Sequence, residues 1–302
     1  MFISQSTDEK MKLEEIYLKE KEPVISYEVF PPKEDFDGKK LEKLFSELKK
    51  LKQFNPSLIS VTYGAGGSNQ NESIEIISRI KNELKITPMP HFTCVSTSEH
   101  NIKSYLKNIE SLGVENILAL RGDIPENGEI CKDFEYASDL VSCIKKESTL
   151  SVAVAGYPEG HKEAVSLQKD IEYLKKKVDL GAQIVYTQLF FNNSHFFAFV
   201  EMCQKQGIDI PVIPGILPVS SYKQLEKMAS LCKVEVPETL AKALEQHKDD
   251  KDYIKKYGTE FASNQCIELL QKGVRGLHFY TLNKADAVSD ILSNLLLTKE
   301  TL

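Results

Sequence analysis

One carboxylate stands inside an apolar stretch of the sequence. Glu28 lies in the run ISYEVFPP, between Tyr27 and Val29. Removing a carboxylate from water is costly unless the group is paired or functional. Burial would also raise its pKa toward the range of a general acid at neutral pH. The alternative is a structural ion pair with a neighbouring Lys or Arg, and the residues alone leave both interpretations open.

Two further segments contain groups that bind anions or heterocycles. In the first, Arg121 suits a phosphate, Gly122 permits close backbone approach, and Asp123 can accept hydrogen bonds from a ring N–H. An ion pair that caps the next helix is the alternative. The second, GAGGS at 64–68, could hold phosphate oxygens with backbone N–H groups. It lacks the GxGxxG spacing, and on its own it indicates a turn.

Polar and aromatic side chains elsewhere are compatible with ligand binding or with packing. His91 lies inside an apolar run and is typical of a core histidine, whereas His161 follows a YPEG turn. The Gln188 amide could recognise a heterocycle or make a structural hydrogen bond. Phe191 and its neighbour Phe190 could stack on a planar ring or pack.

Lys284 could form a Schiff base, as in an aldolase-like lyase, or bind an anion.

Short apolar runs alternate with segments of helical period, which predicts βαβ units and a parallel sheet. Eight such units favour a closed (β/α)8 TIM barrel of the α/β class over an open sheet. The predicted strands are 24–30, 57–63, 89–95, 115–121, 151–157, 183–189, 210–216 and 275–281. In such barrels the active site lies at the C-terminal ends of the strands, where the residues above are found.

The helical pattern also predicts the domain organisation. A short helix over 8–20 precedes the barrel, and extra helices over 220–232 and 237–272 precede the last strand, with Pro237 opening the second segment. The charged run 247–258 indicates a solvated helix face or loop. We expect residues 1–302 to form a single catalytic domain, with the barrel over about 24–297.

Composition excludes several classes of function. The formal net charge is −6 and the pI about 5.7, which gives no electrostatic footprint for nucleic acid or an anionic membrane. The N-terminus has no apolar signal segment, so we expect a cytoplasmic location. The six cysteines form no CxxC pair and have no metal-ligand spacing with histidine, so we expect reduced thiols and no metal site.

Taken together and in order, the strand-end segments resemble methylenetetrahydrofolate reductase of the compact bacterial type, over about residues 24–295. The resemblance rests on ISYEVFPPK (25–33), SVTYGAGGS (60–68), PHFTCV (90–95), ILALRGD (117–123), SVAVAGYPEGH (151–161), DLGAQIVYTQLFF (179–191), IPGILPVSSY (213–222) and GLHFYTLN (276–283).

The resemblance implies FAD at the barrel mouth and NAD(P)H as co-substrate in a ping-pong reduction of methylenetetrahydrofolate, which feeds methionine biosynthesis. The implied cofactor-binding residues are Thr62, Tyr63, Ala65, His91, Arg121, Gly122, Asp123, Ala137, Tyr157, His161, Asp170, Tyr173, Lys176 and Lys177.

The resemblance also implies that Glu28 is the general acid and that Asp123 and Gln188 complete the catalytic set. The implied substrate-binding residues are Glu28, Asp123, Gln188, Phe191, Tyr222, Tyr280 and Lys284. Three positions depart from the family pattern: relatives often have Phe at position 222, Arg at 284 and Asn at 173.

Two alternative functions remain open from the sequence. The first is a folate- or flavin-binding barrel that depends on a partner electron-donor subunit. The second is a lyase that uses Lys284. The sequence does not distinguish NADH from NADPH or give the reaction direction, and a homo-oligomer is a family expectation.

Overall fold

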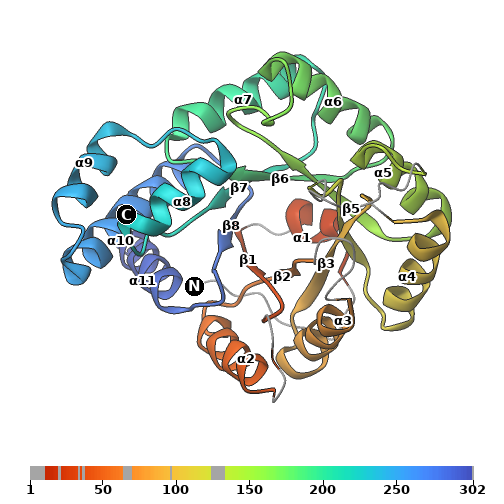
Figure 1. Ribbon diagram of the computed structural model, residues 1–302, viewed down its shortest axis with the longest axis horizontal. Coiled ribbons are helices and arrows are strands. Elements are labelled where there is room, and N and C mark those ends of the chain that lie inside the picture. Colours follow the sequence, from red (N-terminus) through yellow and green to blue (C-terminus); the bar gives the residue numbers. More distant parts are fainter. Residues whose placement is uncertain are drawn as a thin grey trace.

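The eight strands of the protein close into one parallel barrel. The computed structural model describes residues 11–19, 22–32, 35, 38–63, 70–95, 97–123 and 133–300. Each strand pairs with its neighbours in chain order, and β8 pairs with β1, so the predicted barrel is confirmed (Figure 1). The strands are β1 Val24–Val29, β2 Leu58–Val61, β3 Thr87–Thr93, β4 Asn116–Leu120, β5 Ser151–Gly156, β6 Ile184–Leu189, β7 Val212–Ile216 and β8 Gly276–Tyr280.

Helices surround the barrel and connect successive strands (Figure 1). They are α1 Leu13–Lys19, α2 Lys39–Lys52, α3 Gln70–Arg79, the π-helical turn η2 Ile80–Leu84, α4 Glu99–Ser111, α5 Ala137–Glu147, α6 Leu167–Asp179, α7 Asn193–Lys205, α8 Tyr222–Cys232, α9 Glu238–Gln246, α10 Lys251–Gln271 and α11 Asp286–Glu300. Among the described helices, none combines the length and the apolar composition that a membrane span requires.

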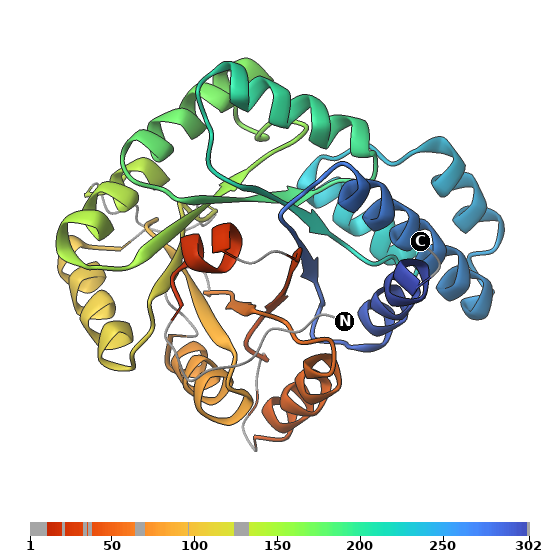
Figure 2. The same ribbon diagram turned by 180° about the vertical axis from the view of Figure 1, so that it is seen from behind.

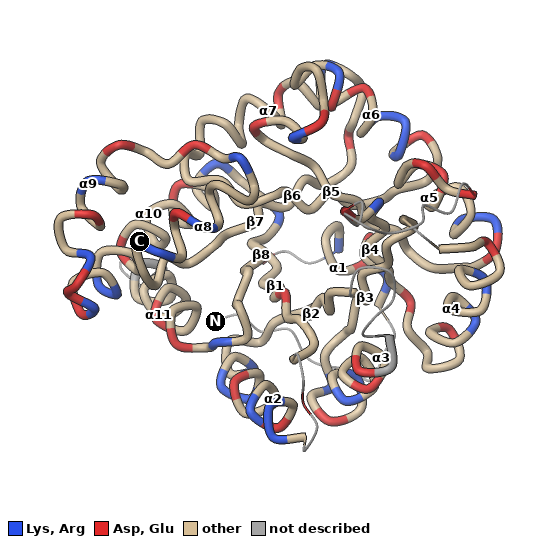
Figure 3. Tube along the Cα trace, viewed as in Figure 1, with Lys and Arg blue, Asp and Glu red and all other residues tan. Residues whose placement is uncertain are grey.

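The strands form because their runs are apolar on both faces, as a parallel sheet covered by helices requires. Charged residues lie mainly along the outer helices, whereas the barrel strands are almost free of them (Figure 3). Within the eight described strands, Glu28 is the only Asp, Glu, Lys or Arg. Its placement therefore needs an explanation other than packing.

The amphipathic helices each bury one apolar face against the barrel. On α2 these are Leu44, Phe45, Leu48 and Leu51, and on α4 they are Ile102, Tyr105, Leu106 and Ile109. All belong to one apolar layer between the helices and the outside of the barrel. These residues recur at intervals of three and four, which is the spacing of one helical face.

Helix α1 closes the N-terminal end of the barrel and lies over its centre in Figure 2. The Tyr17 hydroxyl donates to Ser26 Oγ at 3.3 Å and lies 2.8 Å from the Tyr186 hydroxyl. Ser26 Oγ in turn lies 2.8 Å from His278 Nδ1. This buried network fixes the inward-facing residues of β1, β6 and β8 in one layer.

The same network determines which residues reach the barrel mouth. Successive side chains of a strand alternate between its faces, so residues two positions further along face the interior as well. These residues are Glu28 on β1, Gln188 on β6 and Tyr280 on β8. Parallel pairing puts all three one layer nearer the C-terminal end, where barrel active sites lie.

Three helices fill the long connection from β7 to β8, which confirms the prediction of more than one. Pro237 immediately precedes α9, and Asp250 caps α10 by accepting a hydrogen bond from the Tyr253 N–H at 3.0 Å. The predicted charged run 247–258 is thus a loop followed by the first turns of a helix. With the ends of β6 and β7, these helices enclose an apolar cluster centred on Leu217, Leu225 and Leu240.

Candidate active site

Glu28 occupies the inner wall of the barrel near its C-terminal mouth. Its side chain is 21% exposed, and its Oε2 lies 3.6 Å from Nε2 of His91 on β3. Burial raises the pKa of Glu28 from 4.5 to about 8 and lowers the pKa of His91 from 6.5 to about 3. At neutral pH both groups are therefore uncharged, and Glu28 retains a proton that it can donate.

Several buried polar atoms near this pair lack partners. Ser60 Oγ, His91 Nε2 and Thr93 Oγ1 make no hydrogen bond within the described part of the chain. Strand alternation turns all three toward the barrel interior, because Leu58 and Met89 on the same strands belong to its inner core. Buried polar groups normally have partners, so these atoms are suited to meet a polar ligand at the mouth.

Tyr280 and Gln188 also face the interior, and Tyr280 on β8 lies beside Glu28 in the register of the neighbouring strands β8 and β1. The Tyr280 hydroxyl donates to the Thr187 carbonyl oxygen at 2.6 Å. A Cβ on Gly215 would lie 2.3 Å from that oxygen and 2.8 Å from the Tyr280 hydroxyl, so this contact requires glycine. Glycine in the strand run IPGI was the available sequence signal for such an approach. Gln188 Oε1 accepts the Leu189 N–H at 2.9 Å, which leaves the amide NH2 for other partners.

The turn after β8 is fastened to the end of β1, a contact that the sequence did not reveal. Thr281 Oγ1 donates to the Glu28 carbonyl oxygen at 2.7 Å. The Asn283 side chain accepts from the Phe30 N–H at 3.0 Å and donates to the Phe30 carbonyl oxygen at 2.7 Å. These bonds hold the backbone of Glu28 in place beside the mouth.

Arg121 and Asp123 follow β4 and pair with the loop that follows β5. The Arg121 guanidinium donates twice to the Glu163 carboxylate, at 2.7 Å in each case. Lys162 Nζ donates to Asp123 Oδ1 at 2.8 Å. Both residues thus form ion pairs, but with the β5–α6 loop rather than as a cap of the next helix, α5, as the alternative had it. Each pair is partly exposed and open to exchange with a ligand.

Gly122 between them has a conformation that other residues rarely adopt. Its φ is +87°, and a Cβ there would lie 2.8 Å from Val95 Cγ1 and 2.9 Å from Thr93 Cβ. Glycine is therefore required both by the backbone and by the packing behind it. This geometry sets the direction in which Arg121 and Asp123 leave the strand.

The β5–α6 region brings together four more of the predicted cofactor-binding residues. The rings of Tyr157 and His161 meet edge to face at 4.7 Å, and the His161 N–H donates to Asp170 Oδ2 at 3.1 Å. Lys177 Nζ reaches back from α6 to donate to the Ala155 carbonyl oxygen at 2.7 Å. Burial lowers the pKa of Lys177 to about 8, although Asp170 opposes that shift.

These features fit a cofactor that has a flat heterocycle and a diphosphate. The mouth offers unpartnered polar atoms on β2 and β3, as described above. Arg121 after β4 and Lys177, which reaches from α6 to the end of β5, supply cations that suit the oxygens of a diphosphate. The residues therefore fit FAD, which the family resemblance implied.

The structure says less about how the other predicted cofactor-binding residues would contact a cofactor. The Tyr63 ring packs outward against Phe92 and Tyr105, at 4.9 and 5.5 Å, so its backbone rather than its ring borders the mouth. Ala65 and the rest of the GAGGS segment lie outside the described residues. Thr62 follows β2, Ala137 begins α5, and Tyr173 and Lys176 lie exposed on α6.

Three predicted substrate-binding residues lie outside the inner barrel wall that carries Glu28. Phe191 is 4% exposed and belongs to the apolar cluster beneath α8 to α10, and Tyr222 packs on the edge of that cluster at the start of α8. Lys284 is exposed in the turn after β8. Substrate contacts by these three side chains stay predictions.

Comparison with known proteins gives the family. The profile described as methylenetetrahydrofolate reductase matches residues 12–296. "Methylenetetrahydrofolate reductase (NADH) 1" of Arabidopsis thaliana is 40% identical over 291 residues, which are 91% of this chain and 49% of that protein. The chain thus spans about half the length of the plant relatives.

Bacterial relatives match over most of both chains. "5,10-methylenetetrahydrofolate reductase" of Buchnera aphidicola subsp. Schizaphis graminum is 40% identical over 266 residues, which are 88% of this chain and 89% of that protein. The Escherichia coli (strain K12) protein of the same name is 36% identical over 262 residues, which are 87% of each chain.

Solved structures support the fold alone. An uncharacterized Clostridium thermocellum protein that binds two copies of 5-methyl-5,6,7,8-tetrahydrofolic acid superposes with a TM-score of 0.68 at 15% identity, covering 97% of this chain and all of that one. Dihydropteroate synthase from Xanthomonas albilineans superposes with a TM-score of 0.52 at 13% identity, covering 92% and 94%.

Proposed function

Because the chain belongs to the methylenetetrahydrofolate reductase family, we propose that it reduces 5,10-methylenetetrahydrofolate to 5-methyltetrahydrofolate with NAD(P)H and bound FAD. The observation that carries the proposal is Glu28. It is the only Asp, Glu, Lys or Arg in the described strands, faces the mouth, and has its pKa raised by burial to about 8. Its side chain is therefore a proton donor at neutral pH.

The cofactor would be held between β2 and α6 in this proposal. Arg121 and Lys177 would neutralise the diphosphate, and His91 would offer its unpartnered Nε2 to the ring system. When bound there, FAD would supply the flavin chemistry by which hydride passes between NAD(P)H and the folate in a ping-pong reaction.

Glu28 would protonate N10 of the folate. The C–N10 bond then breaks, the five-membered ring opens, and the methylene group on N5 becomes an iminium that accepts hydride. Loss of the proton leaves a carboxylate in a poorly solvated position beside a neutral His91. This environment favours the protonated form of Glu28 at neutral pH, so reprotonation restores the acid.

The other inward-facing groups would orient the pterin. The free NH2 group of Gln188 can donate to a ring acceptor, and Tyr280 is fixed by its bond to the Thr187 carbonyl. Asp123 would accept from the pterin amino group once Lys162 releases it. Gln188 and Tyr280 are neutral, and Asp123 would exchange Lys162 for the pterin amino group. Binding of the pterin therefore leaves no buried charge without a partner.

An anaerobic absorbance spectrum of the purified protein tests the proposal. We expect a flavin band that bleaches when NADH is added and returns when methylenetetrahydrofolate follows. A flavin band that neither NADH nor NADPH bleaches would favour the partner-dependent barrel. A protein that binds no FAD on reconstitution would overturn the proposal.

No observation favours the lyase alternative. Schiff-base lysines work in desolvated surroundings or beside another cation, whereas Lys284 is exposed. The single-domain organisation over 1–302, the cytoplasmic location and the homo-oligomer stay predictions.

A further inference from the structure

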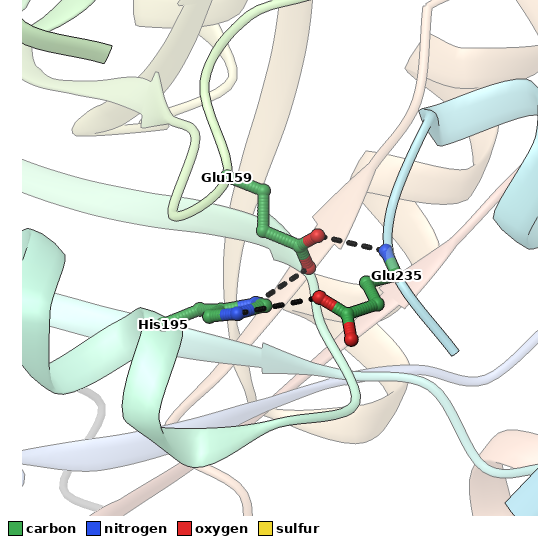
Figure 4. A group of neighbouring side chains, drawn as sticks. All are labelled: Glu159, His195 and Glu235. Atoms are coloured by element: carbon green, nitrogen blue, oxygen red, sulfur yellow. Dashed lines mark hydrogen bonds and ion pairs between the residues drawn. The ribbon is translucent and has the colours of Figure 1, made fainter. Parts of the chain in front are cut away.

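A second cluster of chemically active side chains lies outside the inner barrel wall. It consists of Glu159, His195 and Glu235, here called the His195 cluster (Figure 4). Glu159 comes from the loop between β5 and α6, His195 from the first turn of α7, and Glu235 from the segment between α8 and α9. One ligand atom of each residue lies within 4.8 Å of the others.

The cluster is tightly assembled, yet its polar atoms are not satisfied. His195 Nδ1 lies 3.4 Å from Glu159 Oε1, and His195 Nε2 lies 3.6 Å from Glu235 Oε2. Glu159 Oε1 and His195 Nδ1 are both buried and make no hydrogen bond to any residue that the structure describes. The other oxygen of Glu159 accepts the Glu235 N–H at 2.7 Å, which holds that carboxylate in place (Figure 4).

A buried carboxylate oxygen that faces a buried imidazole nitrogen without a hydrogen bond is costly. A metal cation removes that cost because it accepts an electron pair from each atom. Tetrahedral zinc with bonds of about 2.0–2.2 Å separates its ligands by about 3.3–3.6 Å. The 3.4 Å between Nδ1 and Glu159 Oε1 matches that separation, so Nδ1 is the nitrogen that would bind the ion. Glu235, whose side chain is mostly exposed and now faces Nε2, would turn toward the ion to complete the set.

Exposure and charge are also consistent with a cation. The side chains of Glu159, His195 and Glu235 are 15, 29 and 66% exposed, so two ligands are largely buried and the third lies at the solvent. Two carboxylates and a neutral imidazole balance the charge of a divalent ion. An imidazole ligand selects zinc or a similar transition metal over Mg²⁺ or Ca²⁺.

We propose that the His195 cluster is a Zn²⁺ site with three protein ligands and a fourth position open to water. The ion would join the β5–α6 loop to α7 and to the segment after α8. Glu159 lies in the same loop as Tyr157 and His161. The ion would therefore fix one segment that borders the candidate active site, and its binding does not depend on the proposed reductase activity.

Zn²⁺ titration of the chelator-treated full-length protein, in competition with a chromogenic chelator at pH 7.5, tests the site. We expect one ion per chain, and a loss of affinity of at least about tenfold in both His195→Gln and Glu235→Gln, because even groups that only support metal ligands contribute that much. Glu235 is mostly exposed, so its variant should fold normally.

His247→Gln is the matched control, since His247 is half-buried and stacks on Tyr253 away from the cluster. Substitution with Co²⁺ should give a tetrahedral absorption spectrum that the His195 variant lacks and the His247 variant keeps. Absence of a bound ion would overturn the proposal. Equal binding by the wild type and the His195 variant would overturn it too.

Discussion

The Glu28 carboxyl group and the His91 imidazole face each other at 3.6 Å without forming an ion pair. Burial has opposite effects on the two pKa values: it raises that of Glu28 to about 8 and lowers that of His91 to about 3. Removing both charged groups from water would cost more free energy than the attraction between the two charges would return. The pair therefore keeps its proton on the carboxyl group, where an acid catalyst needs it.

Replacement of Glu28 by Gln should separate the two half-reactions of the proposed cycle. Gln keeps the shape of the side chain but cannot donate the proton, so folate reduction should fall by about 10²- to 10⁴-fold. Flavin reduction by NADH needs no such proton and should change less than about threefold. Stopped-flow absorbance measures both steps. Equal losses in the two steps would contradict the role of Glu28 as the acid.

The same variant should change how stability depends on pH. Glu28 has a raised pKa, so the folded state keeps its proton between pH 4.5 and about 8 while the unfolded state loses it. Stability from this group is complete below pH 4.5, declines across that interval and is lost above pH 8. Glu28→Gln should therefore gain stability relative to the wild type as pH rises, by at least about 1 kcal/mol at pH 8 compared with pH 5.

Urea denaturation of both proteins at pH 5, 6.5 and 8 measures that difference. The comparison cancels the contributions of all other titrating groups, because only position 28 differs. A stability difference that stays constant over this range would show that the Glu28 carboxyl group is not desolvated in the folded state.

Apolar runs predicted the barrel strands well because strands buried on both faces leave a continuous signal in the sequence. The observed strand boundaries differ from the predicted ones where strand pairing, rather than composition, determines where a strand begins or ends. The third strand begins at Thr87 rather than 89, because Thr87 pairs with Leu58 on β2. The second strand ends at Val61 rather than 63, because the chain leaves the sheet before the GAGGS segment.

The candidate site could be predicted in part, for a related reason. Every barrel strand ends at the same face, so Glu28, Gln188 and Tyr280 could be grouped without coordinates. Contacts between loops leave no comparable pattern in the sequence. Neither the pairing of Arg121 with Glu163 nor the meeting of His195 with Glu159 and Glu235 leaves a spacing signal, because the partners come from separate connections.

Substitution of Gly122 by Ala should destabilise the protein through two separable effects. The left-handed backbone at φ +87° costs about 1–2 kcal/mol for a residue with a Cβ. Contact of that Cβ with Val95 and Thr93 at under 3 Å should add about 1–3 kcal/mol. Gly38→Ala is the control: its φ is +72°, and a Cβ there has nothing within 4 Å. Equal changes in unfolding free energy in the two variants would rule out the packing effect.

Glu163 should compete with an anionic cofactor for Arg121. Because the Glu163 carboxylate receives both 2.7 Å bonds of the guanidinium, FAD must displace it before its diphosphate can use Arg121. Glu163→Gln should strengthen FAD binding by about two- to fivefold, the range that a partly exposed ion pair allows. Arg121→Lys should weaken binding, since an ammonium cannot make the same two parallel bonds.

Flavin fluorescence titration at low and moderate salt measures both affinities. Glu172→Gln serves as the control, because it removes a carboxylate of α6 that pairs with Lys169 rather than with Arg121. An equal gain in the Glu172 variant would indicate a general charge effect rather than competition. Weaker FAD binding by the Glu163 variant would mean that this carboxylate orients Arg121 toward the cofactor, and that the pair at 2.7 Å persists in the bound state.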